Sequence, residues 1–285
     1  MTLGGLYVPL ITPFAPDGNV ALPALERLAH DVLDAGANGV VALGTTAEPS
    51  SLTATERARV LDLITAVCRE HGAQLIVGAN DAATLGSVRA TAALTLVPPF
   101  VRPGEEGVVA HLTALAGASS VPLVIYHVPY RTAQPLSVAT VRRLAAVPNV
   151  AGLKLAVGGL DADTIELLAD PPPGLAILGG EDVVISPLLA LGAHGGILAS
   201  AHLATADFAE LTRSWQSGLG HRLARLSAAL FAEPNPTVIK AVLHETGRIP
   251  TPDVRLPLLP AAKESMRAAL DAADQLTGQR RTRSQ

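Results

Sequence analysis

The chain has 285 residues, of which 49% are hydrophobic and 16% charged, so it can bury a large core and has no compositional sign of disorder. A typical domain has about 100 to 200 residues, but barrels of about 250 residues also form one domain. The formal net charge is −4, and the arginines are scattered along the sequence. This pattern argues against nucleic acid or an anionic membrane as a partner and favours a small molecule.

The amino terminus has no charged region followed by a signal-like apolar core, and no run approaches the roughly 20 apolar residues of a membrane span. We therefore expect a cytoplasmic protein. Cys68 is the only cysteine, which excludes an internal disulfide and a cysteine-based zinc cluster. Its place in an amphipathic helical pattern predicts a buried structural thiol. The histidines show no paired ligand spacing, so we expect no metal.

Short apolar, β-branched runs recur along the first two thirds of the chain, each bounded by Gly, Pro or polar residues. Such runs are typical of parallel strands buried on both faces. The eight predicted strands are 6–11, 38–44, 74–79, 93–98, 122–127, 151–156, 175–180 and 195–200. Because helical stretches alternate with them, the pattern predicts an α/β protein with a closed (β/α)₈ TIM barrel; a doubly wound open sheet is the alternative.

The helical stretches between the strands include 22–36, 53–72, 104–119 and 136–147. Thr53 and Glu56 have the spacing of a capping box, and Gly36 and Gly72 are typical helix ends.

The strand pattern stops near residue 205, and helical patterns follow it. We expect three parts: the barrel over 1–204, a C-terminal all-helical extension over 205–279, and a frayed polar tail over 280–285.

Lysine occurs only at positions 154, 240 and 263. Strand alternation in 151–156 places Lys154 toward the barrel lumen, near the C-terminal end of its strand, where such barrels place their active sites. A desolvated amine can be neutral enough to attack a carbonyl. The alternative is a structural lysine that is paired with a carboxylate, but the strand that carries Lys154 contains no Asp or Glu.

The preceding strand has the same alternation, which turns Tyr126 inward and His127 outward. Tyr126 should therefore lie beside Lys154, where a phenol can relay protons. A core tyrosine with a satisfied hydroxyl is the alternative.

A small turn over 44–48, with the sequence GTTAE, follows the second strand. Its backbone N–H groups and two hydroxyls could hold a carboxylate, although a plain turn is the simpler interpretation.

Four strings together resemble the dihydrodipicolinate synthase and N-acetylneuraminate lyase family of pyruvate-dependent class I aldolases. They are GTTAE (44–48), YHVPYRT (126–132), GLK (152–154) and EPNPTVIK (233–240), which match the family's motifs in order along essentially the whole chain.

The resemblance implies a lyase without an added cofactor, in which pyruvate forms a covalent Schiff base on Lys154. It also implies a proton relay through Tyr126 and Thr45, and a substrate carboxylate held by Thr45 and Thr46. The reaction would condense pyruvate with an aldehyde or cleave a 2-keto-acid.

Further positions follow from the resemblance. Gly180 and Ile197 match residues that line the pyruvate pocket, Lys240 matches a structural lysine, and Arg131 matches the residue that binds the carboxylate of aspartate semialdehyde, which indicates a second substrate bearing an anion. The family suggests a homotetramer, a dimer of dimers.

One relay position departs from the family. Phe100 stands where the synthase has a tyrosine lent by a neighbouring subunit, and a phenyl ring cannot pass a proton. The resemblance therefore implies the pyruvate chemistry, whereas the identity of the aldehyde stays open.

Several alternatives stay open: an N-acetylneuraminate or 2-keto-3-deoxy-sugar-acid lyase, or a catalytically silent paralogue that binds a keto-acid. A phosphate-handling barrel is a weaker alternative, suggested by the glycine pairs at 179–180 and 195–196.

Overall fold

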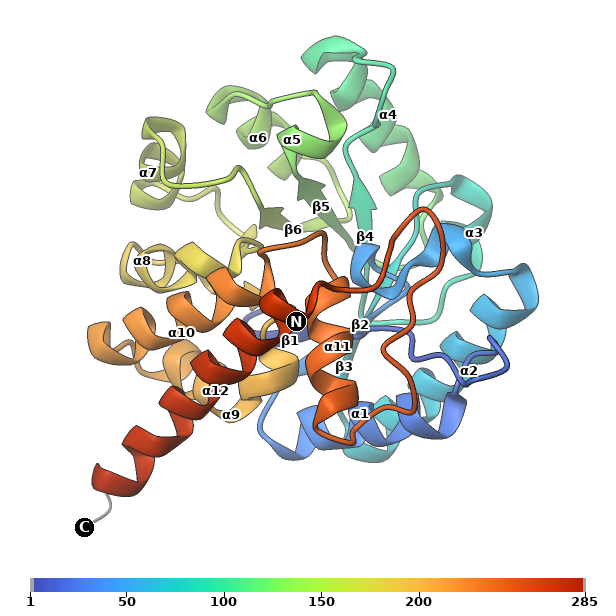
Figure 1. Cartoon of the computed structure of the whole chain (residues 1–285). Coiled ribbons are helices and arrows are strands. Elements are labelled where there is room, and N and C mark those ends of the chain that lie inside the picture. Colours follow the sequence, from blue (N-terminus) through green and yellow to red (C-terminus); the bar gives the residue numbers. More distant parts are fainter. Residues whose placement is uncertain (1–2, 284–285) are drawn as a thin grey trace.

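Eight parallel strands close into a barrel with the order β1-β2-β3-β4-β5-β6-β7-β8 in the computed structural model, which describes residues 3–283 (Figure 1). The strands are β1 (Gly5–Pro9), β2 (Gly39–Ala42), β3 (Gln74–Gly78), β4 (Ala92–Leu96), β5 (Leu123–His127), β6 (Val150–Leu155), β7 (Ala176–Gly179) and β8 (Gly195–Ile197). β8 pairs with β1, so the sheet has no open edge. The predicted barrel is confirmed, and the doubly wound alternative is wrong.

Side chains of the strands alternate between two apolar layers, which is the packing that such a barrel requires. Val124, Tyr126 and Ile197 belong to a cluster inside the barrel. Ile125 and Leu153 belong to a larger cluster that packs against the surrounding helices. The strand alternation that predicts an inward Tyr126 is therefore observed.

The helices between the strands surround the barrel in Figure 1. They are α1 (Leu22–Asp34), α2 (Ala54–His71), α3 (Ala82–Ser87), α4 (Gly104–Ala118), α5 (Pro129–Thr132), α6 (Val138–Ala145), α7 (Ala162–Ala169) and α8 (Ile185–Ala190), with the 3₁₀ turns η1 (Thr45–Ala47), η2 (Pro49–Ser51) and η3 (Asp182–Val184). The capping box is present, because Thr53 accepts from the N–H of Glu56 and the Glu56 carboxylate accepts from the N–H of Thr53.

Four helices follow β8 in the described part of the chain: α9 (Ala201–Arg213), α10 (Ser217–Leu230), α11 (Thr237–Glu245) and α12 (Lys263–Arg283). In Figure 1 they lie together, in orange and red, on one side of the barrel. α9 begins four residues before the predicted boundary at 205. Within the predicted polar tail over 280–285, α12 extends through residues 280–283, and residues 284–285 lie outside the described part.

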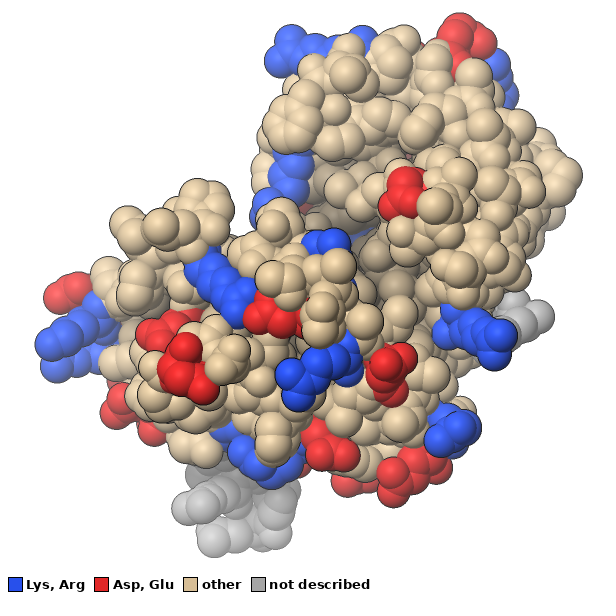
Figure 2. Space-filling model, turned by 90° about the vertical axis from the view of Figure 1, so that its right-hand side faces the viewer, with Lys and Arg blue, Asp and Glu red and all other residues tan. Residues whose placement is uncertain are grey.

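Cys68 is buried on α2, and burial raises the pKa of its thiol to about 11, as fits a structural rather than a reactive cysteine. Within residues 3–283, no helix is long and apolar enough to cross a membrane. Figure 2 shows positive and negative side chains interspersed on one face of the molecule, without a continuous basic stripe.

Candidate active site

Lys154 and Tyr126 are neighbours inside the barrel. The two residues are directly paired between β6 and β5. The Nζ atom of Lys154 lies 4.2 Å from the centroid of the Tyr126 ring, and both side chains are buried. The structure therefore brings together the amine and the phenol that strand alternation had predicted to meet.

Burial changes the ionisation of both groups. Loss of solvent lowers the pKa of Lys154 below the ordinary lysine value, and the nearby Asp182 carboxylate partly opposes that shift. Burial also raises the pKa of Tyr126 to about 12, so its phenol keeps its proton at neutral pH. The lowered pKa makes the neutral, nucleophilic form of the Lys154 amine easier to reach, and the protonated phenol beside it can serve as a proton donor.

Two carboxylates follow β7 and lie near Lys154. Asp182 is 3% exposed, and its Oδ2 atom accepts a 2.6 Å hydrogen bond from the N–H of Ser200. Burial raises the pKa values of both Glu181 and Asp182. Sequence reasoning missed this pair because it looked for an acidic partner within the lysine's own strand, whereas the partner comes from the end of the next one. Two carboxylates directly after a predicted barrel strand were the available signal.

Gly180 gives Lys154 the space that its side chain occupies. A Cβ atom on residue 180 would lie 2.7 Å from Cε and 2.9 Å from Cγ of Lys154. Its backbone N–H donates to the carbonyl of Leu155, which fixes this close approach. The lysine side chain therefore occupies the space that a side chain at the predicted pocket residue Gly180 would need.

The GTTAE segment forms the η1 turn directly after β2. The N–H of Ala47 donates to Gly44, whereas the backbone bonds of the described residues include none donated by the N–H of Thr45 or of Thr46. Thr46 is buried and Thr45 half-buried. Adjacent N–H groups and hydroxyls of this kind suit a carboxylate.

A buried ion pair holds the end of this turn. Glu48 has a left-handed backbone, with φ of 54°, and its Oε1 atom lies 2.8 Å from Nζ of Lys240. Lys240 also lies 4.1 Å above the ring of Phe14. The sequence comparison had assigned Lys240 a structural role, and its position against Glu48 agrees with that interpretation.

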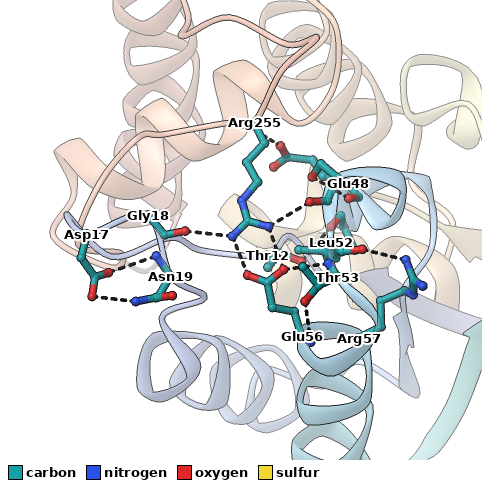
Figure 3. Close-up of polar contacts among 12 residues, drawn as sticks. Thr12, Asp17, Gly18, Asn19, Glu48, Leu52, Thr53, Glu56, Arg57 and Arg255 are labelled. Atoms are coloured by element: carbon teal, nitrogen blue, oxygen red, sulfur yellow. Dashed lines mark hydrogen bonds and ion pairs between the residues drawn. The ribbon is translucent and has the colours of Figure 1, made fainter.

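Arg255 adds a second connection from the C-terminal segment, as Figure 3 shows. Its backbone N–H donates to Oε2 of Glu48, and its guanidinium donates to Glu56 at the start of α2. These bonds join the loop before α12 to the segment that follows β2. The C-terminal region therefore supports the active-site end of the barrel.

The remaining predicted residues lie at different depths. Ile197 is buried in the inner cluster that also contains Tyr126. Arg131 is exposed on α5, where its Nε donates to the hydroxyl of Tyr130, and its charge lowers the pKa values of Lys154 and Tyr126. An exposed cation that acts electrostatically on the buried pair is suited to receive an anionic group from solvent.

Phe100 is exposed to solvent in the single chain. The residue is 89% exposed, and its backbone is left-handed, with φ of 70°.

The hydrogen bonds of the described residues include none between Tyr126 and Thr45, so the relay through Thr45 stays a prediction.

The glycine pairs that suggested phosphate have a packing explanation. A Cβ atom on Gly179 would lie 2.5 Å from Ile185, and one on Gly195 would lie 2.0 Å from the carbonyl oxygen of Gly5. Close packing thus accounts for these glycines. In the part of the chain that is described, no three His, Cys, Asp or Glu side chains are grouped to hold a metal ion.

Comparison with known proteins gives further evidence for the family of this chain. A model described as the dihydrodipicolinate synthetase family matches residues 2–276. A 4-hydroxy-tetrahydrodipicolinate synthase of Neisseria meningitidis serogroup B is 34% identical, with 96% of this chain and 100% of the relative covered. A 4-hydroxy-tetrahydrodipicolinate synthase 2 of Clostridium acetobutylicum is 34% identical, with coverage of 92% and 96%.

Solved structures of dihydrodipicolinate synthases are similar to this chain over nearly its whole length. A chloride-inhibited dihydrodipicolinate synthase of Acinetobacter baumannii, complexed with pyruvate, has a TM-score of 0.89 at 33% identity and covers 96% of this chain and 99% of its own. A structure described as a monomeric dihydrodipicolinate synthase variant has a TM-score of 0.89 at 26% identity, with 97% of each chain covered.

Proposed function

Because the chain belongs to the dihydrodipicolinate synthetase family, we propose that it binds pyruvate as a Schiff base on Lys154 and condenses it with an aldehyde. The chain is a pyruvate-dependent class I aldolase, a carbon–carbon lyase. The observation that carries the assignment of the residue is the buried amine of Lys154, 4.2 Å from the ring of Tyr126.

The neutral amine of Lys154 attacks the C2 carbonyl of pyruvate, and the resulting carbinolamine loses water to give the protonated imine. Loss of a proton from C3 then gives an enamine, which attacks the aldehyde carbon. Hydrolysis of the imine releases the product and restores Lys154. Burial supports the first step because it lowers the pKa of the amine.

Tyr126 suits the proton transfers. Its phenol is protonated at neutral pH, because burial raises its pKa, and it lies beside the amine. It can donate a proton to the departing hydroxyl of the carbinolamine and take one back during hydrolysis. Thr45 is the proposed next member of this relay.

Thr46 and Thr45 are the proposed ligands of the pyruvate carboxylate, through their N–H groups and hydroxyls. Gly180 and Ile197 are proposed to line the same pocket. No added cofactor is needed, because the lysine itself supplies the electron sink once the imine is protonated.

Arg131 is the proposed contact for an anionic second substrate, such as aspartate semialdehyde. Phe100 cannot relay a proton, so either water takes over that role or the natural aldehyde differs from that of the synthase. Sugar-derived aldehydes, including those released by N-acetylneuraminate or 2-keto-3-deoxy-sugar-acid lyases, are therefore the second candidates.

We also propose that the enzyme acts in the cytoplasm and assembles as a homotetramer, a dimer of dimers. The solvent-exposed Phe100 supports an assembled form, since a large apolar side chain in the loop between β4 and α4 gains from being covered by another subunit.

A condensation assay tests the proposal. Pyruvate is mixed with aspartate semialdehyde, N-acetylmannosamine or glyceraldehyde, and turnover is measured for the natural protein, Lys154→Ala and Phe100→Tyr. We expect turnover with at least one aldehyde and its loss in Lys154→Ala. A protein that pyruvate stabilises against heat but that turns over no aldehyde would instead be a keto-acid-binding paralogue. A steep gain of synthase turnover in Phe100→Tyr would indicate divergence from the synthase role.

A further inference from the structure

Asn235 forms a hydrogen bond with a residue of the proposed carboxylate site, although 189 positions separate the two in the sequence. Its Nδ2 atom donates to Oγ1 of Thr46 at 2.9 Å. Asn235 lies in the short segment between α10 and α11, and Thr46 lies in the η1 turn after β2. The contact therefore joins the helical extension directly to the active-site loop.

The direction of this bond decides what the Thr46 hydroxyl can do. A hydroxyl has one proton to donate and two lone pairs with which to accept. Since Oγ1 accepts from Asn235, its own proton is left for another acceptor, and the hydrogen bonds among residues 3–283 include none that Thr46 donates through this hydroxyl. The free proton is the one that a bound carboxylate needs.

The segment that carries Asn235 is held firmly against the loop. The N–H of Thr237 donates to the carbonyl of Pro234, and α11 begins there. One turn further, Lys240 forms its buried ion pair with Glu48. The loop is thus tied at Thr46 to the segment before α11 and at Glu48 to α11 itself. The backbone N–H of Arg255, which follows α11 in the chain, also donates to Glu48 (Figure 3).

We propose that Asn235 is a positioning residue that orients the Thr46 hydroxyl so that its proton points at the substrate carboxylate. The inference rests on the proposed function, because it concerns the binding of pyruvate at that site. Asn235 need not touch the substrate. An amide is well suited to this role because its NH₂ group donates, whereas a carboxylate in the same place would accept the Thr46 proton and compete with the substrate.

The test measures formation of the borohydride-trapped pyruvate adduct as a function of pyruvate concentration, which needs no aldehyde. Asn235→Ala should raise the half-saturating pyruvate concentration about tenfold, as for loss of one hydrogen bond to a charged group, and leave the maximal adduct unchanged. Asn235→Asp is nearly isosteric and should raise it further, because it captures the hydroxyl proton and adds a negative charge. Asn19→Asp, at an exposed asparagine, is the matched control and should behave as the natural protein.

A double-mutant cycle with Thr46→Val separates orientation from general support of the loop. In the Thr46→Val background, Asn235→Ala should change the half-saturating concentration by less than about twofold. The same tenfold effect in both backgrounds would overturn the proposal, as would natural affinity in Asn235→Asp. If the natural protein formed no adduct at all, the proposed function would fail before this inference was reached.

Discussion

Lys154 and Gly180 fit together because residue 180 has no side chain: a Cβ atom there would lie 2.7 Å from Cε of the lysine. Gly180→Ala should therefore displace the amine and lower kcat/KM for pyruvate about a hundredfold, the loss expected when a reacting group moves by about 1 Å. Gly117→Ala, on α4 with no atom within 4 Å of the new Cβ, is the control and should retain full activity. Equal activity of the two variants would refute the packing argument.

Asp182 opposes the depression of the pKa of Lys154. Asp182→Asn removes the negative charge but keeps an oxygen that can accept from Ser200. The pKa of Lys154 should fall further, so the neutral amine should form at lower pH, and the rising limb of kcat/KM against pH should move in the acid direction. A limb that stays in place or moves toward higher pH would contradict this electrostatic coupling.

Lys240 neutralises Glu48 in a site where Lys240 is 0% and Glu48 3% exposed. Lys240→Met should destabilise the protein by about 3 to 5 kcal/mol, because it leaves a buried carboxylate without its partner. Adding Glu48→Gln should recover part of that loss, since the remaining group is neutral. Denaturant unfolding measures both variants, and a double variant less stable than Lys240→Met would show that the pair contributes mainly through packing.

His127 and His202 are buried, and burial lowers the pKa of each to about 4. In the unfolded chain histidine titrates near 6.5, so the unfolded state binds more protons than the native state between these values. The free energy of unfolding should therefore decline as the pH falls from about 6.5 toward 4, with each histidine contributing up to about 1.4 kcal/mol per pH unit. His127→Asn should make that decline shallower, and an unchanged slope would contradict its burial as a neutral imidazole.

The barrel and its central pair could be predicted because local patterns determine them. Strand alternation is a property of a few consecutive residues, so it sufficed to turn Tyr126 and Lys154 into the lumen. The Thr53 capping box is local in the same way, and the structure confirms both of its hydrogen bonds.

The supporting residues could not be predicted in this way because they come from distant parts of the chain. Asp182 lies in the η3 turn that follows β7, whereas Lys154 lies on β6, and Asn235 reaches Thr46 only after the helical extension has packed on the barrel. No repeating pattern in the sequence relates residues that are so far apart in the chain. The start of α9 at Ala201 was likewise missed, because Ala and Leu around residue 200 continue the apolar composition of the preceding strand.

The most direct test of the account is mass analysis after borohydride reduction in the presence of pyruvate. We predict that the peptide containing Lys154 gains the mass of the reduced pyruvate adduct, and that Lys154→Ala gains none. An unmodified Lys154 peptide in the natural protein, or an adduct at Lys240 instead, would contradict the assignment of Lys154 as the Schiff-base residue.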